Sequence, residues 1–239
     1  MFKYSGKLYL IPTTLGISNP LEVLPISIKK VIERIDYYIV ENEKTARKSI
    51  KQVVSSKKQS ALKLYSLNKF TDPAQIPSYL DPCKNGNDMG LLSEAGCPGV
   101  ADPGAEIVRI AHNEGIQVVP LVGPSSILLA MMGSGMNGQS FTFHGYLPID
   151  KKERKQELKT LERISFEKNQ AQIFIETPYR NNKLLEDMLQ ILQPTTRICV
   201  ACDLTLPSEY LLTKTASDWK KTKVDLHKRP TIFVIQKEV

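Results

Sequence analysis

Residues Met89–Gly104, MGLLSEAGCPGVADPG, combine the features of a strand, a loop and the start of a helix. The small and apolar residues Gly90–Ser93 predict a short buried strand, and small side chains dominate the loop that follows. An apolar stripe in residues 107–111 predicts a helix, with Asp102 as its N-cap and Pro103 in its first turn. A strand, a small-residue loop and a helix N-terminus together allow a ligand to approach bare backbone.

Two other stretches have the same pattern. The loop Ile11–Gly16 follows the apolar strand Leu8–Leu10, and the loop Leu121–Ser126 follows the strand Gln117–Pro120. One such loop alone would fit an ordinary strand-to-helix connection equally well. Because ligands bind at the carboxyl ends of strands in open α/β sheets, three such loops predict one shared ligand site.

Strand and helix patterns alternate through the first half of the chain, which predicts a parallel sheet with helices on both faces. The strands are expected at 8–11, 37–40, 61–65, 90–93 and 117–121. The second half restarts with a strand at 140–144 and a charged helix at 151–164, and its later strands predict a mixed sheet. The expected fold class is therefore α/β, with two α/β subdomains, residues 1–121 and 122–239.

A helix that begins near Pro124 is apolar on every side between Ile127 and Met132. A helix of this kind is expected to be buried. The same apolar residues could support a dimer interface, and the sequence leaves these two readings open.

The composition is that of a globular chain, since 41% of its 239 residues are hydrophobic and 24% are charged. No apolar run approaches the roughly 18 residues of a membrane span, so no membrane association is expected. Cys199 and Cys202 form a C-x-x-C in an apparent strand, where residues three apart point to opposite faces, so a redox or zinc pair is not expected. With three histidines and no H-x-x-x-H, we predict no metal site, reduced cysteines and a cytoplasmic location.

The formal net charge is +7, and the basic residues are clustered in 44–58, 151–163 and 220–229. A polyanionic partner such as RNA would explain these clusters. Solvated helix faces are the plainer alternative.

Four motifs, LYLIPTTLG, LLSEAGCPGVADPG, VVPLVGPSS and FHGYLP, occur in this order. They resemble the motifs of the tetrapyrrole methylase superfamily of S-adenosylmethionine-dependent methyltransferases. They are most similar to the branch that methylates a cytidine ribose 2′-oxygen in 16S ribosomal RNA. The resemblance implies S-adenosyl-L-methionine as the cofactor, a cofactor cleft between the two subdomains, an RNA substrate (rRNA or a ribosomal subunit) and a homodimer.

The resemblance also implies which residues contact the cofactor. They come from the loops quoted above and from strand ends in the second half: Ser93, Ala95, Gly96, Val100, Ala101, Asp102, Ser125, Ser126, Tyr146, Leu147, Glu176, Thr177, Pro230 and Thr231. For the last two pairs, an ordinary turn at a strand end is an equal alternative.

Methyl transfer to a ribose hydroxyl requires alignment of the two reactants and loss of a proton, so a base or a polarising cation is expected nearby. The sequence leaves four candidates open for this role: Glu41, Lys44, Glu94 and Asp203.

Some stretches differ from the usual motifs of the ribosomal RNA branch. Val40–Ala46 reads VENEKTA where AEDTRHT is usual, and Ala201–Leu206 reads ACDLTL where ARELTK is usual. The cofactor motifs are kept, whereas these substrate-side motifs are not. Two other functions therefore stay open: methylation of a tetrapyrrole or other small molecule, and a catalytically inactive module that binds the cofactor or RNA.

Overall fold

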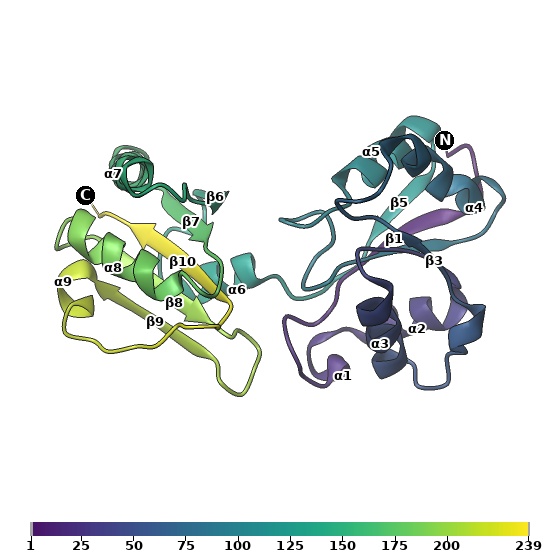
Figure 1. Cartoon of the computed structure of the whole chain (residues 1–239), viewed down its shortest axis with the longest axis horizontal. Coiled ribbons are helices and arrows are strands. Elements are labelled where there is room, and N and C mark those ends of the chain that lie inside the picture. The colour runs from purple at the N-terminus through teal and green to yellow at the C-terminus, as the bar shows by residue number, and fades with distance from the viewer. Residues whose placement is uncertain (1, 239) are drawn as a thin grey trace. The chain divides into compact units, whose positions relative to one another are not determined.

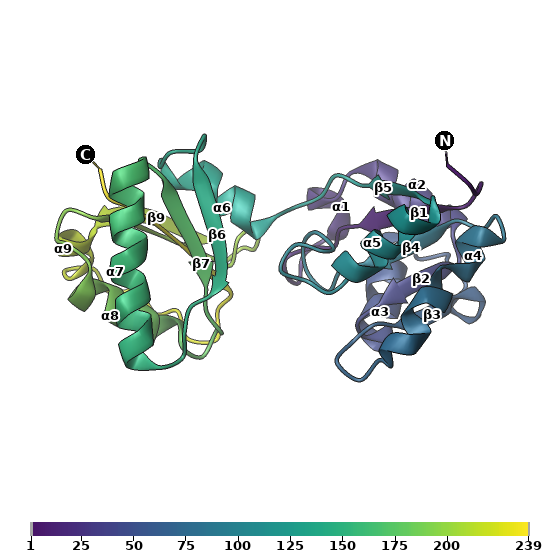
Figure 2. The ribbon, with the colours of Figure 1, turned by 90° about the horizontal axis from the view of Figure 1, so that it is seen from above.

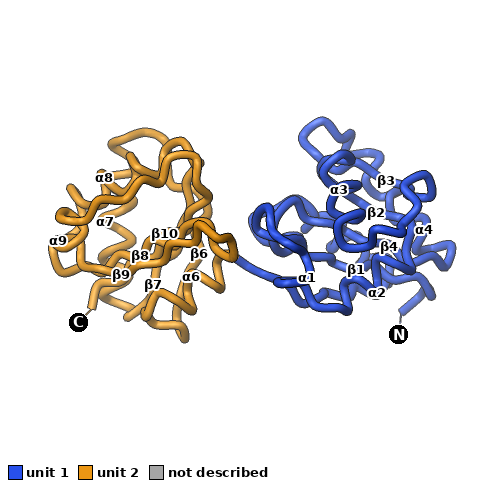
Figure 3. The backbone as a smooth tube through the Cα atoms, turned by 90° about the horizontal axis from the view of Figure 1, so that it is seen from below, with its two compact units in different colours: residues 1–125 blue, residues 126–239 orange. Residues whose placement is uncertain are grey.

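The structure, a computed structural model, describes residues 2–238. It consists of two compact units, unit 1 and unit 2, with the boundary between Ser125 and Ser126 (Figure 3). The predicted boundary, after Leu121, lies in the same irregular segment between a strand and a helix.

Unit 1 contains a sheet of five parallel strands, which are labelled in Figure 2. The strand order is β3-β2-β4-β1-β5, with β1 at Lys7–Ile11, β2 at Tyr37–Val40, β3 at Lys63–Ser66, β4 at Met89–Leu92 and β5 at Gln117–Pro120. Ile11 and Val40 both lie opposite Leu92 in the sheet. The carboxyl ends of β1, β2 and β4 therefore lie side by side, and this edge is where the loops predicted to bind a ligand begin.

Helices cover both faces of this sheet because its strands carry apolar residues on both sides. On β1, Tyr9 and Ile11 pack into one core and Leu8 packs into the other. The first core includes residues of α2 and α3, and the second includes residues of α5. The helical segments of unit 1 are α1 Pro20–Val23, α2 Ile26–Arg34, α3 Glu43–Val53, η1 Gln59–Ala61, η2 Pro73–Leu80, α4 Asp81–Lys84 and α5 Ala105–Glu114.

Unit 2 contains a mixed sheet, as predicted, in the order β6-β7-β10-β8-β9 (Figure 1). Its strands are β6 Phe141–Tyr146, β7 Ala171–Ile175, β8 Arg197–Cys202, β9 Tyr210–Thr215 and β10 Thr231–Gln236. Strands β6 and β7 are parallel, and the other neighbouring pairs are antiparallel.

Three helices, α7 Lys151–Lys168, α8 Asn181–Ile191 and α9 Ala216–Trp219, contribute to one large core in unit 2. Phe174 and Phe233 stack at its centre, with their ring centroids 6.1 Å apart. The buried Trp219 donates a hydrogen bond of 2.8 Å from its indole nitrogen to the carbonyl oxygen of Ile198. Helix α6, Ser126–Ser134, packs against β8, β9 and β10.

Several predicted details were wrong. Helix α5 begins at Ala105, and Gly104, with a φ of 130°, occupies the N-cap position without a side-chain cap. Asp102 is therefore not the cap. A Cβ at Gly104 would lie 2.7 Å from the Leu91 side chain, so this turn requires glycine.

Helix α6 is not buried on all sides, because Leu128 is 54% exposed and Met132 is 79% exposed. Helix α7 continues beyond the predicted end at Ile164, up to Lys168, where Asn169 ends it with a left-handed φ of 46°. Strand β3 begins at Lys63 rather than at Ala61, because residues 59–61 form a 3-10 turn.

Candidate active site

The loops after β1, β4 and β5 meet at the carboxyl edge of the unit 1 sheet. The amide of Thr13 donates a hydrogen bond of 3.0 Å to the carbonyl oxygen of Gly96. The thiol of Cys97 lies 3.4 Å from the carbonyl oxygen of Pro124. Each loop thus contacts another, and the structure brings together the three stretches that the sequence singled out.

The loop from Ser93 to Gly104 presents small side chains and backbone to solvent. Ala95, Gly99 and Ala101 are exposed, whereas Ser93 and Gly96 are buried. Gly96, Gly99 and Ala101 have positive φ angles of 74°, 76° and 54°. These left-handed turns keep the chain close to the sheet edge and leave backbone polar groups accessible for a ligand.

Three carboxylates gather at this edge. Burial raises the pKa of Asp102, the negative charges of Glu41 and Glu94 raise it further, and a hydrogen bond from Ser93 opposes the shift. Glu94 accepts a hydrogen bond of 2.6 Å from the hydroxyl of Thr45 in the first turn of α3. A positively charged ligand group would relieve the repulsion among these carboxylates.

Two of the four candidates for the catalytic base, Glu41 and Glu94, are thus near enough to Asp102 for their charges to raise its pKa. Lys44 is exposed in the first turn of α3. Asp203 lies in unit 2, where its carboxylate accepts hydrogen bonds of 2.7 Å from Arg229 and 2.9 Å from Ser208. Arg229 already pairs with the negative charge of Asp203 within unit 2, and this pairing argues against a role for Asp203 as the base.

Sequence reasoning missed Thr45 as a site residue. The only available signal was its place in the stretch VENEKTA, which departs from the usual motif. Its contact with Glu94 links the start of α3 to the loop after β4.

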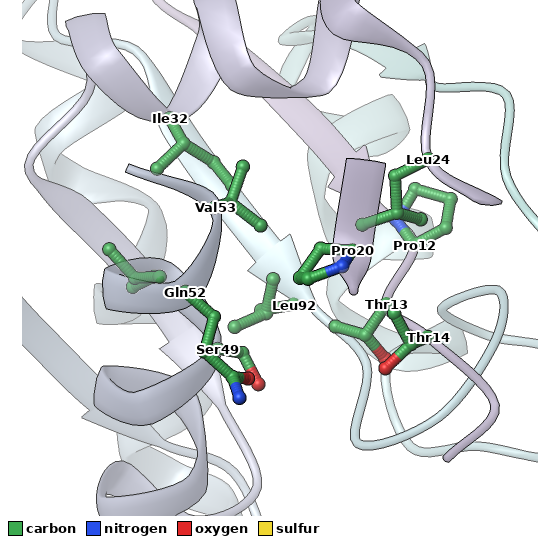
Figure 4. A pocket seen from close by; sticks show the side chains of 11 residues that line it. Pro12, Thr13, Thr14, Pro20, Leu24, Ile32, Ser49, Gln52, Val53 and Leu92 are labelled. Carbon is green, nitrogen blue, oxygen red and sulfur yellow. The ribbon is translucent and has the colours of Figure 1, made fainter. Parts of the chain in front are cut away.

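A pocket in unit 1 lies between the loop after β1, helix α3 and the end of β4 (Figure 4). Thr13 and Thr14 line it from the loop after β1, Ser49 and Gln52 line it from α3, and Leu92 lies at the end of β4. The hydroxyl of Thr13 is buried and has no hydrogen-bond partner among residues 2–238. A buried hydroxyl of this kind fits a bound ligand or water that supplies the missing partner.

The predicted residues of the second half gather at one edge of the unit 2 sheet. Tyr146 and Ile232 both lie opposite Ile175, and Thr231 lies opposite Cys202. Glu176 follows Ile175 directly. The six residues Tyr146, Leu147, Glu176, Thr177, Pro230 and Thr231 therefore lie at or next to these strand ends.

Glu176 is held in place at that edge. Its side chain is 2% exposed and forms an ion pair of 2.6 Å with Arg180. It also accepts a hydrogen bond of 2.6 Å from the amide of Thr177. Ser125 and Ser126 lie at the boundary between the two units.

The described residues, 2–238, contain no group of three His, Cys, Asp or Glu side chains that could hold a metal ion. Within the same range, no helix is long and apolar enough to cross a membrane. The four cysteines are free thiols; Cys83, Cys199 and Cys202 are buried, and Cys97 is partly exposed.

The sequence profile of the Tetrapyrrole (Corrin/Porphyrin) Methylases matches residues 15–219, which is most of the chain. The chain belongs to this family. It is therefore a methyltransferase, as its motifs predicted.

Several curated relatives carry the name ribosomal RNA small subunit methyltransferase I. The protein of Bacillus subtilis is 32% identical over 213 residues, which cover 89% of this chain and 68% of that protein. The protein of Vibrio cholerae is 28% identical over 227 residues, which cover 92% of this chain and 75% of that protein.

Solved structures confirm the fold. The methyltransferase CobJ superposes with a TM-score of 0.64 at 16% identity, over 98% of this chain and 95% of that one. A uroporphyrin-III C-methyltransferase of Thermus thermophilus, complexed with S-adenosylhomocysteine, superposes with a TM-score of 0.53 at 14% identity, over 97% of this chain and 98% of that one. At these identities the likeness concerns the fold alone.

Proposed function

We propose that this protein transfers a methyl group from S-adenosyl-L-methionine to a ribose 2′-oxygen of ribosomal RNA in the cytoplasm. The observation that supports the substrate most directly is the 32% identity to a ribosomal RNA small subunit methyltransferase over 89% of the chain. The basic residues on α3 and α7 agree with an RNA partner. The working form that we propose is a homodimer.

S-Adenosyl-L-methionine supplies an electrophilic methyl group on a positively charged sulfonium. We propose that the loop 93–104 holds it through exposed backbone and small side chains. In this arrangement the carboxylate of Asp102 binds a hydroxyl or the ammonium group of the cofactor. The carboxylates of Asp102, Glu41 and Glu94 together favour the positive charge of the cofactor. By resemblance to the family motifs, we also propose cofactor contacts for Ser125 and Ser126 and for the six strand-end residues of unit 2.

The RNA hydroxyl must lose its proton as the new bond forms. We assign this proton to Glu94 or Glu41, because both carboxylates are near enough to Asp102 for their charges to raise its pKa. Thr45 orients Glu94 through its hydrogen bond. Asp203 is excluded from this proposed role because Arg229 and Ser208 already bind its carboxylate.

The test is methyl transfer from labelled S-adenosyl-L-methionine into small ribosomal subunits and purified 16S RNA from a strain that lacks the corresponding gene. Mapping of the labelled nucleotide should find a 2′-O-methylated ribose. Label in a tetrapyrrole and none in RNA would favour the small-substrate alternative. Cofactor binding without any transfer to RNA or to a tetrapyrrole would favour an inactive binding module.

Substitutions separate binding from chemistry. Glu94→Gln and Glu41→Gln should each weaken S-adenosylhomocysteine binding only slightly, because two of the three carboxylates remain, and the variant that removes the base should lower kcat by about 10²-fold or more. Full activity in both variants would remove these two residues from the proposed mechanism.

A further inference from the structure

A large aromatic ring is exposed next to the carboxyl end of β7. Tyr179 is 69% exposed. The His227 ring meets it edge-on, with the ring centroids 5.8 Å apart and the planes at 77°. The ammonium of Lys228 lies 5.9 Å from the centroid of the Tyr179 ring. We call Tyr179, His227 and Lys228 the Tyr179 platform.

Asn182 of α8 forms two hydrogen bonds to the turn that carries His227 and Lys228. Its side-chain amide donates a hydrogen bond of 2.8 Å to Asp225 and accepts one of 2.8 Å from the amide of Leu226. Leu226 is fully buried. The turn is therefore fixed to α8 by two side-chain bonds and an apolar anchor.

Arg229 fixes the other end of the same turn. Its guanidinium donates hydrogen bonds to the carboxylate of Asp203 at 2.7 Å and to the carbonyl oxygen of Ser208 at 2.6 Å. The amide of Lys228 donates a bond of 3.0 Å to the carbonyl oxygen of Pro178, the residue before Tyr179. The turn and the aromatic ring are thereby held next to each other.

Lys228 is in the left-handed region, with a φ of 60°. A residue with a Cβ is unfavourable in this conformation, and it persists only where the surrounding structure imposes it. Here the bonds at both ends of the turn impose it. The consequence is that the backbone of Lys228 is fixed next to Tyr179, and its exposed ammonium group lies within reach of the exposed ring.

We propose that the Tyr179 platform binds one nucleotide of single-stranded RNA, with the base stacked on Tyr179 and a phosphate bound by Lys228. This inference rests on the RNA substrate of the proposed function. Proteins that bind unpaired nucleotides stack the bases on exposed aromatic rings and bind the backbone with nearby cations. The platform lies at the edge of the unit 2 sheet that carries Glu176 and Thr231, two of the residues proposed to contact the cofactor.

The test measures binding of a fluorescein-labelled single-stranded RNA, with the sequence around the mapped methylation site, by fluorescence anisotropy across a salt series. Tyr179→Leu should raise the Kd about five- to a hundredfold, the range for loss of one base–aromatic stack. The slope of log Kd against log salt should stay the same, because no charge is removed. Tyr179→Phe should keep the wild-type affinity, since the ring remains.

Lys228→Gln should give the complementary result. It should reduce the salt slope by about 0.7, the value for one phosphate contact on a single strand. Phe166→Leu is the matched control: Phe166 is 43% exposed, and the ammonium of Lys237, beyond the end of β10, lies 5.4 Å from its ring centroid. This second ring–lysine pair is at the opposite end of β10, so its loss should not change RNA affinity.

Two outcomes would overturn the proposal that the Tyr179 platform binds a nucleotide, while leaving the proposed function intact. In the first, wild-type protein and Tyr179→Leu bind and methylate RNA equally well. In the second, Tyr179→Leu weakens binding of S-adenosylhomocysteine instead, which would place the ring against the cofactor. A wild-type protein that neither binds nor methylates RNA would overturn the proposed function and this inference with it. Circular dichroism and thermal melting of each variant establish that it is folded.

Discussion

Asp102 combines a predicted binding role with an electrostatic penalty. Burial and the charges of Glu41 and Glu94 raise its pKa, so the folded protein holds this proton more tightly than the unfolded chain does. The folded state is therefore relatively favoured below the ordinary aspartate pKa, about 3.9, and loses that advantage as the pH rises through the raised pKa. A charge that costs stability at neutral pH is typical of a functional site.

Replacement of this charge should separate stability from binding. Asp102→Asn should increase the free energy of unfolding at pH 7 relative to the wild type, and the difference should shrink as the pH falls toward about 4. Its Kd for S-adenosylhomocysteine should rise about tenfold, since a hydrogen bond to a charged group contributes roughly 1.5 kcal/mol or more. Urea denaturation at several pH values and calorimetry measure the two effects. A destabilised variant with unchanged ligand affinity would contradict both parts.

Gly96 and Gly99 offer a matched pair in the same loop. Both have left-handed φ angles, 74° and 76°. A Cβ at Gly96 would lie 3.2 Å from the Leu15 side chain, whereas a Cβ at Gly99 would have no atom within 4 Å.

Gly96→Val and Gly99→Val should both lose about 1 to 3 kcal/mol of stability from backbone strain. Only Gly96→Val should also lose cofactor affinity, because its branched side chain would displace the contact between the loops after β1 and β4. Calorimetry with S-adenosylhomocysteine compares the two variants. Equal loss of affinity in both would show that strain alone, and not the loop contact, governs binding.

At the scale of elements, α3 places basic side chains near the loop after β4, since its Thr45 binds Glu94. Lys44 and Lys48 are exposed, but Arg47 donates a hydrogen bond of 2.7 Å to the carbonyl oxygen of Gln59. Arg47 therefore fixes the segment after α3, and a binding test should leave it in place.

Lys44→Gln with Lys48→Gln should raise the Kd for RNA and lower the salt slope by up to about 1.4, because each phosphate contact on a single strand contributes roughly 0.7. Cofactor affinity should be unchanged. The charge-matched control is the double variant Lys3→Gln with Lys63→Gln, at the amino-terminal edge of the same sheet. Lys63 is the first residue of β3, and the backbone amide of Lys3 donates a hydrogen bond to the carbonyl oxygen of Gly115, just before β5. If the control lowers the slope as much as the α3 variant, the effect comes from net charge and not from α3.

Elements with a clear period or strong end signals were predictable from the sequence. The continuous apolar run Leu8–Ile11 locates β1 to within one residue, and the apolar positions Ile28, Val31 and Ile32 mark the buried face of α2. The end of α5 is marked by Gly115 with a φ of 76°. Its start was misplaced, because Asp102 and Pro103 look like a helix start. The turn at Gly104 has no room for a Cβ beside the Leu91 side chain of β4, and this tertiary constraint cannot be read from the local pattern.

The candidate site was predictable only where it depends on loops that follow strands. The gathering of Glu41 and Glu94 around Asp102 depends on the order β2-β4-β1 in the sheet, which no local pattern encodes. The exposure of Met132 in α6 has the same origin, since an apolar helix is covered only on the faces that tertiary contacts reach.

At the scale of the whole molecule, the exposed residues of α6 bear on association. Leu128 is 54% exposed and Met132 is 79% exposed. We expect a homodimer that covers this face, so sedimentation velocity at micromolar concentration should show a dimer. Met132→Lys should shift the equilibrium toward the monomer, because a charge would be buried in the interface. Ile17 of unit 1 is also exposed, and Ile17→Lys is the control that should leave the dimer unchanged. A monomeric wild-type protein would reject the prediction.

The four thiols of the chain differ in accessibility, and this difference makes the candidate site chemically addressable. Cys83, Cys199 and Cys202 are fully buried, whereas Cys97 is partly exposed in the loop after β4. Burial raises the pKa of the Cys97 thiol, so an alkylating reagent should modify it slowly and faster as the pH increases. Mass spectrometry should therefore find a single adduct, in the peptide that contains Cys97. If S-adenosylhomocysteine slows this alkylation, the alkylation rate of the natural Cys97 measures how much of the protein has ligand bound.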